Sequence, residues 1–142
     1  MSTTDRLYFL LKHAQLQLAE LTGPALAPYG IDGRELAVLN ALVDQDPLSQ
    51  QEVARRLGID RTTMVALIDG LEDKGLVERH PHPDDRRKNV VELTAGGRDT
   101  RSRATQASED AERRFLAPLG EGDVKRLKET LHLLISAATA HR

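Results

Sequence analysis

The sequence Leu48-Ser49-Gln50-Gln51-Glu52-Val53 opens the stretch that decides the fold, residues 48–93. Ser49 and Glu52 are three residues apart, the spacing at which an N-cap residue and a glutamate cap each other's backbone N–H groups. The short helix that begins here is expected to end at Gly58, because glycine adopts the left-handed conformation that closes a helix without steric cost.

A second helix is expected from Arg61 to Lys74, with Asp60 before it as a cap and Gly75 after it. Two capped helices joined by a tight turn predict a helix-turn-helix. Apolar residues recur on one face of the second helix at the i, i+3, i+4 and i+7 spacing of a buried stripe. They are Met64, Leu67, Ile68 and Leu71.

The outer face of the second helix is small and nearly uncharged near its start. Thr62, Val65 and Ala66 lie there, next to Arg61 and Thr63. Such a surface can approach a DNA major groove closely, where a hydroxyl can hydrogen-bond base edges and methyl groups can contact thymine. An ordinary surface helix would carry the same residues, so the interpretation depends on their position in a helix-turn-helix.

The next segment predicts a two-stranded wing that pairs residues 77–80 with residues 89–93. Its tip, Pro83-Asp84-Asp85-Arg86-Arg87-Lys88, contains turn-forming residues and ends in three consecutive cations. A tip of this kind can insert an arginine into a narrow minor groove, where the negative potential is strongest. A solvated charged loop is the alternative for the same residues.

The composition describes a soluble helical protein of 142 residues, with 39% hydrophobic, 30% charged and only 3% aromatic residues. Because there is no cysteine, a disulfide, a thiolate zinc site and a cysteine redox switch are excluded. The sequence has no apolar run long enough to cross a membrane and no signal-peptide pattern, so we expect a cytoplasmic protein without a membrane partner.

The formal net charge of −2 argues against a nucleic-acid partner, which usually binds a basic domain. DNA responds to the local potential, however, and acids on flanking helices would leave a basic patch in the central stretch. The cations available for that patch are Arg55, Arg56, Arg61, Arg86, Arg87 and Lys88.

Helices are expected on both sides of the central stretch. A leading helix from about Thr4 to Thr22 is interrupted at Gly23-Pro24, and a turn follows at residues 28–30. Asp32 then caps another helix, with Glu35 at the capping-box position. Residues 44–47 are expected to end that helix.

Two helices are expected after the wing, from Ala95 to about Leu116 and from about Glu121 to Ala140, the first of them capped by Thr94. The first and last helices of the chain carry apolar stripes that the winged core does not need. We expect these two helices to join two copies of the chain in a homodimer. The second helix of each helix-turn-helix would then lie about 34 Å from its counterpart, on a pseudo-palindromic operator. Covering the monomer's own core is their alternative role.

These expectations divide the chain into three parts. They are residues 1–30 for dimerisation, residues 31–93 for the winged helix-turn-helix, and residues 94–142 for the linking and dimerisation helices. The fold class is mainly α with a small β-wing.

The chain resembles the MarR family (multiple antibiotic resistance regulators) over nearly its whole length. In the wing, Asp85-Arg86-Arg87 fits the family's Asp-x-Arg motif, and Leu93-Thr94-Ala95-Gly96-Gly97 fits Leu-Thr-x-x-Gly. Leu71-Glu72-Asp73-Lys74-Gly75-Leu76-Val77 fits Leu-Glu-x-x-Gly-Leu-Val, and Arg79 follows at the expected place.

The resemblance implies that Arg87 enters the minor groove and that Asp85 orients it. It also implies an obligate dimer, and repression relieved by a small anionic or phenolic effector bound between the leading helix, the second helix and the winged domain. His13, Tyr29 and Arg34 are the candidate effector contacts, with ordinary packing or surface roles as the alternative.

One departure from the family affects the prediction. Many members carry a basic or longer polar side chain where this sequence has Val65, Ala66 and Gly70. Direct base readout by the second helix is therefore expected to be sparse, with more weight on the wing. The predicted DNA-binding residues are Ser49, Gln50, Arg61, Thr62, Thr63, Val65, Ala66, Asp85, Arg86, Arg87 and Lys88.

Two other functions were weighed against DNA binding. An enzyme is disfavoured because the histidines are scattered and none lies in a nucleophile or base motif; they are His13, His80, His82, His132 and His141. His80 and His82 alternate on one strand and could bind a metal, but the sequence identifies no further ligand, so no metal or cofactor is expected. A winged helix used only for protein contacts is the remaining alternative, which the cationic tip disfavours.

Overall fold

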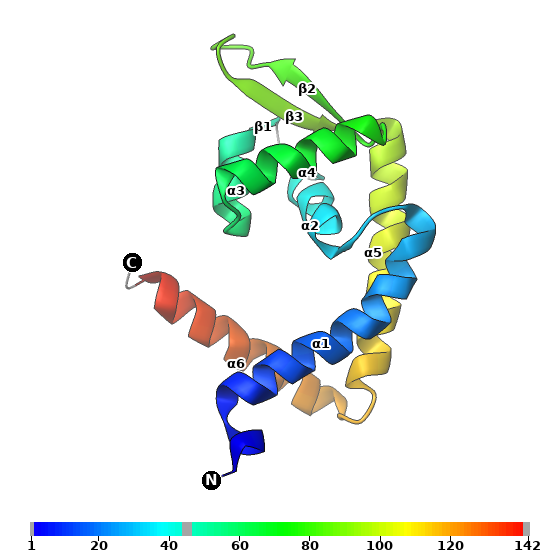
Figure 1. Ribbon diagram of the computed structural model, residues 1–142, viewed down its shortest axis with the longest axis vertical. Helices are drawn as coiled ribbons and strands as arrows, with labels where there is room; N and C mark the ends of the chain where they lie inside the picture. The colour runs from blue at the N-terminus through cyan, green and yellow to red at the C-terminus, as the bar shows by residue number, and fades with distance from the viewer. Residues whose placement is uncertain (1, 44–46, 141–142) are drawn as a thin grey trace. The chain divides into compact units, whose positions relative to one another are not determined.

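The structure, a computed structural model, describes residues 2–43 and 47–140 and confirms a mainly helical fold with a small β-wing (Figure 1). The elements are η1 (Thr3–Asp5), α1 (Leu7–Leu26), η2 (Ala27–Tyr29), α2 (Gly33–Leu42), β1 (Leu48–Ser49), α3 (Gln50–Leu57), α4 (Arg61–Asp73), β2 (Val77–Pro81), β3 (Asn89–Leu93), α5 (Ala95–Leu116) and α6 (Glu121–Ala140).

The chain divides into two compact units. The winged unit comprises residues 22–109, and the terminal unit comprises the chain up to residue 21 and from residue 110 onward. The boundaries expected at residues 31 and 93 both fall inside the winged unit. Residues 44–47 were expected to end the helix capped by Asp32, and of these, residues 44–46 lie outside the described part of the chain.

Helix α1 does not stop at Gly23-Pro24, and this prediction was wrong. The helix continues through Pro24 to Leu26. Proline removes one helical hydrogen bond, but its fixed φ is compatible with a helix. The side chain of Leu26 is 2% exposed in the core of the winged unit, and burying a leucine offsets a lost hydrogen bond.

Capping side chains begin the next two helices in different ways. At α2 the predicted capping box is complete, because Asp32 accepts from the Glu35 N–H at 2.9 Å and Glu35 accepts from the Asp32 N–H at 3.1 Å. At α3 only half of the predicted box forms. Ser49 accepts from the Glu52 N–H at 3.1 Å, but the Glu52 carboxylate binds Arg55 and Arg56 instead.

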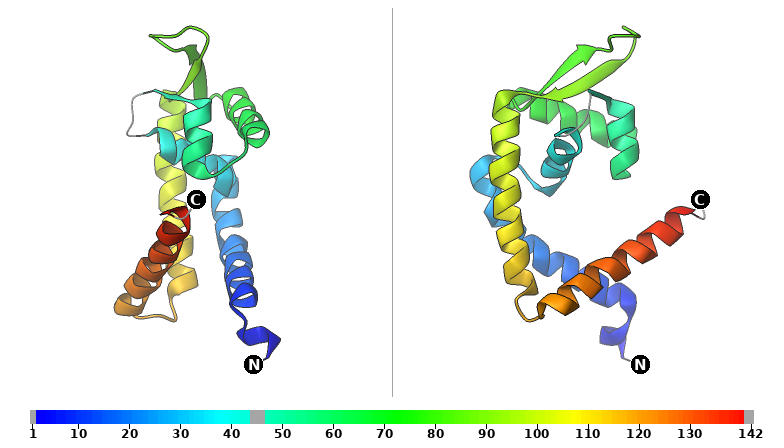
Figure 2. Two further views of the ribbon diagram at one scale, coloured as in Figure 1. Left: turned by 90° about the vertical axis from the view of Figure 1, so that its left-hand side faces the viewer. Right: turned by 180° about the vertical axis from the view of Figure 1, so that it is seen from behind.

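The wing belongs to a three-stranded antiparallel sheet in the order β1-β3-β2, not to the two-stranded ribbon that was predicted. Strand β1 was missed because it is only two residues long, too short for an alternating pattern. It pairs Leu48 with Val91 and Ser49 with Val90. The loop between β2 and β3 projects beyond the helices of the winged unit in both views of Figure 2.

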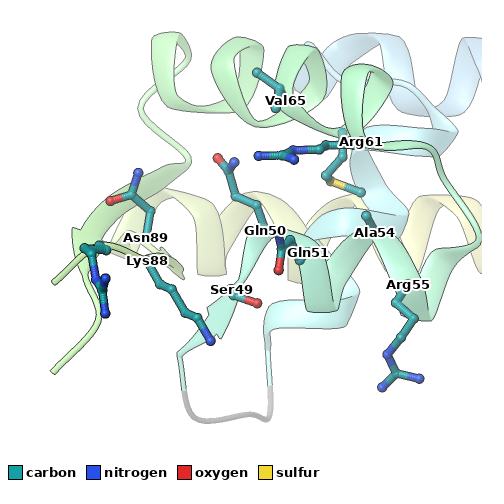
Figure 3. A pocket seen from close by; sticks show the side chains of 11 residues that line it. Ser49, Gln50, Gln51, Ala54, Arg55, Arg61, Val65, Lys88 and Asn89 are labelled. Carbon is teal, nitrogen blue, oxygen red and sulfur yellow. The ribbon is translucent and has the colours of Figure 1, made fainter. Parts of the chain in front are cut away.

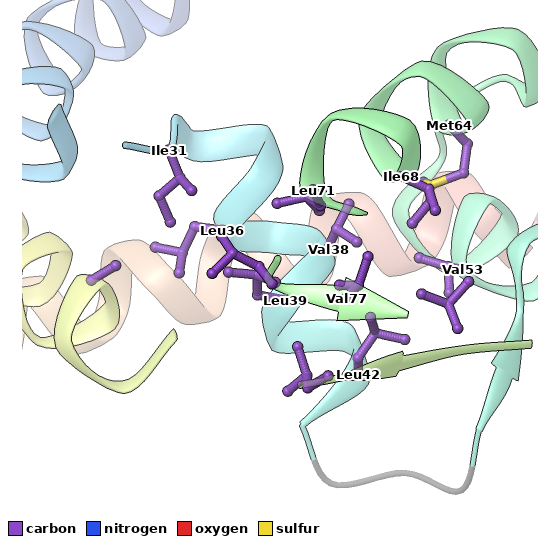
Figure 4. Packing of buried hydrophobic residues seen from close by; sticks show 14 of the residues in the cluster. Ile31, Leu36, Val38, Leu39, Leu42, Val53, Met64, Ile68, Leu71 and Val77 are labelled. Carbon is purple, nitrogen blue, oxygen red and sulfur yellow. The ribbon is translucent and has the colours of Figure 1, made fainter. Parts of the chain in front are cut away.

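The core of the winged unit is aliphatic, as the low aromatic content requires. Figure 4 shows side chains from α2, α3, α4 and β2 meeting there. The predicted stripe of α4 lies in it, with Met64, Ile68 and Leu71 at 0–1% exposure and Leu67 half-buried at its edge. This packing leaves the opposite face of α4 to solvent.

A partly buried ion pair joins the start of α2 to the end of α4. Glu35 is 8% exposed, and its carboxylate accepts from the Lys74 ammonium at 2.7 Å. Lys74 also donates to the backbone carbonyl of Gly30 at 2.7 Å. Gly30 itself has φ +71°, which favours glycine.

The Leu-Thr-x-x-Gly segment attaches α5 to the end of the helix-turn-helix. The Thr94 hydroxyl donates to the Gly75 carbonyl at 2.6 Å and accepts from the Gly97 N–H at 2.9 Å, which confirms it as the cap of α5. Gly97 lies against the backbone of Leu76, where a Cβ would be only 1.9 Å from the carbonyl oxygen. Glycine is required here by close approach.

The terminal unit contains the first part of α1, the end of α5 and all of α6. Large apolar side chains on its helices are exposed in the single chain. They include Leu7, Tyr8, Leu10, Leu11 and Leu16 on α1 and Leu127, Leu133, Leu134 and Ile135 on α6. None of the helices within the described residues combines the length and the apolar content that a membrane span requires.

Replacing Gly97 with alanine is expected to lower the free energy of unfolding by about 1–3 kcal/mol, the usual cost of overpacking. The added Cβ would clash with the Leu76 carbonyl, and backbone must move to relieve it. Urea denaturation measures the effect. Gly96→Ala is the matched control, since its Cβ would meet only atoms at 3.7 Å. An equal loss in both variants would contradict the close-approach explanation.

Candidate nucleic-acid interface

A pocket of about 460 Å³ lies between α3, the N-terminal part of α4 and the end of the β2–β3 loop of the wing. Figure 3 shows Gln50 and Arg61 extending into it, while Arg55 extends away from them. The residues lining the pocket are Ser49, Gln50, Gln51, Ala54, Arg55, Arg61, Met64, Val65, Arg87, Lys88 and Asn89.

The pocket is positively charged although the chain is not. Arg55, Arg61, Arg87 and Lys88 line it, and no carboxylate is among the described residues that do so. The net charge of −2 therefore does not describe this surface. A local concentration of cations is what an anionic backbone such as that of DNA responds to.

The N-terminal half of α4 presents the small outer face that the sequence predicted. Thr62, Val65 and Ala66 are exposed, Val65 by 37%. Thr63 is used differently, because its N–H and its hydroxyl both donate to the Asp60 carboxylate at 2.8 Å. These two bonds lower the pKa of Asp60. The Thr63 hydroxyl is thus bound to Asp60, the residue that caps α4.

The wing tip presents Arg87 to solvent at the edge of the pocket that it helps to line. Its side chain is 93% exposed, and its partner among the described residues is Asp85, which accepts from Arg87 Nε at 3.4 Å and from the Arg87 backbone N–H at 3.1 Å. The Lys88 N–H donates to the Asp85 carbonyl at 3.0 Å and closes the turn. Asp85 is thus in contact with the arginine that it was predicted to orient.

Behind the pocket, Arg79 of β2 connects the wing to both helices of the helix-turn-helix. Its guanidinium donates to Gln50 at 2.6 Å, to Glu72 at 2.8 Å and to Asp69 at 2.6 Å. The side chain is only 19% exposed. The sequence placed Arg79 in a family pattern but did not predict these contacts.

An arginine cluster on α3 changes the acidity of Glu52. Hydrogen bonds from Arg55, and then from Arg56, lower the pKa of Glu52 to about 2 from an ordinary 4.5. The same pairing raises the pKa of Arg55. Arg55 therefore reaches the pocket with its charge partly compensated.

The predicted DNA-binding residues fall into two sets. The pocket brings together Ser49, Gln50, Arg61, Val65, Arg87 and Lys88. Thr62, Thr63, Ala66, Asp85 and Arg86 lie outside its lining. Sequence reasoning missed Gln51 and Asn89, although their positions directly beside Gln50 and Lys88 could have indicated them. The roles of all these residues on DNA remain predictions.

The candidate effector residues belong to different units. His13 lies in the terminal unit, where its ring stacks on Phe9 with centroids 4.1 Å apart. Tyr29 and Arg34 lie in the winged unit, Tyr29 half-buried against the core and Arg34 exposed.

The two histidines of the wing do not share a strand face. His80 pairs with Glu78 at 3.3 Å, whereas His82 lies beyond the end of β2 and accepts from the Asp84 N–H. Among the residues that the structure describes, no group of three or more His, Cys, Asp or Glu side chains could hold a metal ion.

A helix-turn-helix with a wing and a cationic pocket defines a winged-helix protein suited to duplex DNA. A model described as MarR family matches residues 29–88. The transcriptional repressor CouR, solved bound to a 23-mer DNA duplex, is 33% identical and has a TM-score of 0.88, covering 93% of this chain and 94% of that chain. The chain belongs to the MarR family.

Two further relatives are similar to this chain. CouR from Rhodococcus jostii RHA1 bound to p-coumaroyl-CoA is 27% identical with a TM-score of 0.83, and the match covers 94% of each chain. The transcriptional repressor NicR of Pseudomonas putida is 38% identical over 63 residues, 44% of this chain. That match spans only 40% of the length of NicR.

The carboxyl group of Glu52 is expected to titrate at about 2, well below its ordinary 4.5, because Arg55 and Arg56 bind its ionised form. Since its folded-state pKa is lowered, this stabilising contribution is complete above pH 4.5 and is lost as the pH falls toward 2. Carboxyl ¹³C shifts followed by NMR measure the pKa.

Arg55→Ala should raise the pKa of Glu52, because Arg55 makes the largest contribution. Arg103→Ala should not, since Arg103 pairs with Asp99 on α5. A wild-type midpoint near 4.5 would contradict the expected pairing.

Proposed function

We propose that this protein is a transcriptional repressor that binds a pseudo-palindromic DNA operator as a homodimer and releases it when a small effector binds. The observation that carries the proposal is the pocket between α3, α4 and the wing, which is lined by four cations and, among the described residues, by no carboxylate. The repressor CouR, of the same fold, has been solved on a DNA duplex.

In the proposed complex, the N-terminal half of α4 enters the major groove. The exposed side chains of Thr62, Val65 and Ala66 are short enough to let the helix backbone approach the bases. Thr62 can hydrogen-bond a base edge, and Val65 and Ala66 can contact thymine methyl groups. Arg61, at the start of the helix, lines the pocket, where a phosphate of the DNA backbone would be bound.

The wing would contact the neighbouring minor groove. Arg87 is almost fully exposed at the tip, and its contact with Asp85 restricts its direction. An arginine in this position is attracted by the negative potential of a narrow minor groove. Arg86 and Lys88 flank it and add attraction to phosphates.

Dimerisation is supported by the apolar surface of the terminal helices. Leu133, Leu134 and Ile135 on α6 are 54–70% exposed in the single chain, as is Leu7 on α1 at 63%. Each Å² of apolar surface left in water costs roughly 25 cal/mol, so a second copy of the chain would gain by covering these helices.

Effector control is supported by a relative, because CouR from Rhodococcus jostii RHA1 binds p-coumaroyl-CoA. For this chain we propose a small anionic or phenolic effector, with Tyr29 and Arg34 of the winged unit as contacts. A cation and a phenol are groups that could bind a carboxylate or a second phenol.

The alternative function is a winged helix that binds only proteins. Duplex DNA binding predicts an affinity that falls by about 0.9 log unit per log unit of salt for each phosphate neutralised. A protein that binds no duplex in a selected-oligonucleotide experiment at low salt would support the alternative and overturn the proposed function.

Replacing Arg87 with alanine is expected to weaken operator binding by about 10- to 100-fold, or roughly 1–3 kcal/mol, through loss of the minor-groove contact. Gel-shift titration measures the affinity. Arg103→Ala, which removes the same charge from an exposed ion pair on α5, serves as the control. Equal affinities of the Arg87 variant and the wild type would refute the role of the wing.

Light scattering at micromolar concentration is expected to give twice the mass of the chain, because the apolar faces of α1 and α6 would be buried between two copies. Arg87→Ala should leave this mass unchanged. A monomer mass for the wild type would rule out the homodimer.

Phenolic acids and their CoA thioesters are the effectors to test first. Release of a fluorescent operator duplex, followed by anisotropy, is the expected response to one of them, and Arg34→Ala should reduce it. Release that is unchanged in variants at Arg34 and Tyr29 would exclude these residues as the effector site.

A further inference from the structure

All three nitrogens of the Arg79 guanidinium donate to protein groups. Nε donates to Gln50 Oε1 at 2.6 Å, Nη1 to Glu72 at 2.8 Å and Nη2 to Asp69 at 2.6 Å. Its backbone N–H also donates to Glu72 at 3.2 Å. With these bonds made and its side chain 19% exposed, Arg79 is not available as a cation for DNA. Any effect of Arg79 on DNA binding must therefore act through the side chains to which it is hydrogen-bonded.

The bond between Arg79 and Gln50 fixes the orientation of the Gln50 amide. A guanidinium has donors and no acceptor, so only the amide oxygen of Gln50 can face it. The amide NH₂ must then point the other way. Within the described residues it has no hydrogen-bond partner, and Gln50 lines the pocket together with Arg61 and Val65 of α4. Gln50 therefore presents its two amide donors to the pocket, while its oxygen faces Arg79.

A free glutamine and a fixed glutamine read DNA differently. A free glutamine pairs with adenine in the major groove by donating to N7 and accepting from the N6 amino group. The oxygen of Gln50 faces Arg79, which uses one of its two lone pairs, so Gln50 is not arranged to present its oxygen and its NH₂ side by side to adenine. Guanine presents two adjacent acceptors, N7 and O6, whereas adenine and cytosine present an amino group that would face the Gln50 donors.

We propose that Arg79 is a positioning residue that makes Gln50 a donor-only reader of a base edge, with a preference for guanine over adenine at one operator position. The inference rests on the proposed DNA-binding function. It assigns specificity to the start of α3, which compensates for the few polar side chains on the outer face of α4.

The test measures the affinity of the full-length protein for a panel of duplexes with each base in turn at every position of a selected operator. Gln50→Met keeps the length of the side chain and removes the donors. It is expected to lose about 10-fold of discrimination at one guanine position and little elsewhere. Arg103→Met on α5, which is charge-matched to the Arg79→Met variant described next, is expected to keep the wild-type preferences.

Arg79 variants test the positioning role. In Arg79→Met the Gln50 amide is free to turn, so adenine should become accepted at the same position. Gln50→Glu should keep the bond to Arg79, and therefore the melting temperature, yet lose the guanine preference. Combining Gln50→Met with Arg79→Met should change the base preference no further than Gln50→Met alone.

Four outcomes are decisive. A guanine preference that disappears in Gln50→Met and relaxes toward adenine in Arg79→Met supports the proposal. A uniform loss of affinity on all duplexes, as a phosphate contact or a structural role of Arg79 would give, overturns it. Variants of Gln50 and Arg79 that bind the operator with wild-type affinity and unchanged base preferences also overturn it. A wild-type protein without any sequence preference refutes the proposed function itself.

Discussion

The pairing of β3 with two other strands is the constraint on which the DNA-facing surface depends. On one side β3 pairs with β1, whose last residue, Ser49, is also the N-cap of α3. On the other side it pairs with β2, which carries Arg79. The start of the helix-turn-helix and the wing are therefore held by one strand, and the pocket between them is a product of sheet pairing. The hydrogen bond between the Gln50 and Arg79 side chains also joins the start of α3 to β2.

The distribution of charge explains how a chain with a net charge of −2 can present a basic surface. Near the pocket, acids are already bound to arginines: Asp69 and Glu72 to Arg79, and Glu52 to Arg55 and Arg56. These exposed pairs add little stability individually. Their larger effect is electrostatic, because carboxylates that would repel phosphates are compensated while Arg61 and Lys88 stay directed to the pocket.

Local signals in the sequence were sufficient for most of the fold. Caps at Asp32, Asp60 and Thr94 begin helices where they were predicted, because capping depends on residues only three positions apart. Contacts between distant residues could not be predicted in this way. The bonds from Lys74 to Glu35 and from Arg79 to Gln50 depend on side-chain directions that tertiary packing decides. For the same reason the sequence found the cations of the candidate site but not their uncharged neighbours Gln51 and Asn89.

The strand order has a consequence for how copies of this protein behave at high concentration. Exposed edge strands can pair with another molecule and start aggregation. Here one edge, β1, has only two residues. The other edge, β2, carries Glu78 and Arg79 and ends in Pro81, which has no N–H to donate. Both edges are therefore poor templates for a further strand, so self-association through the sheet is disfavoured. The wing then stays unpaired and free to contact DNA.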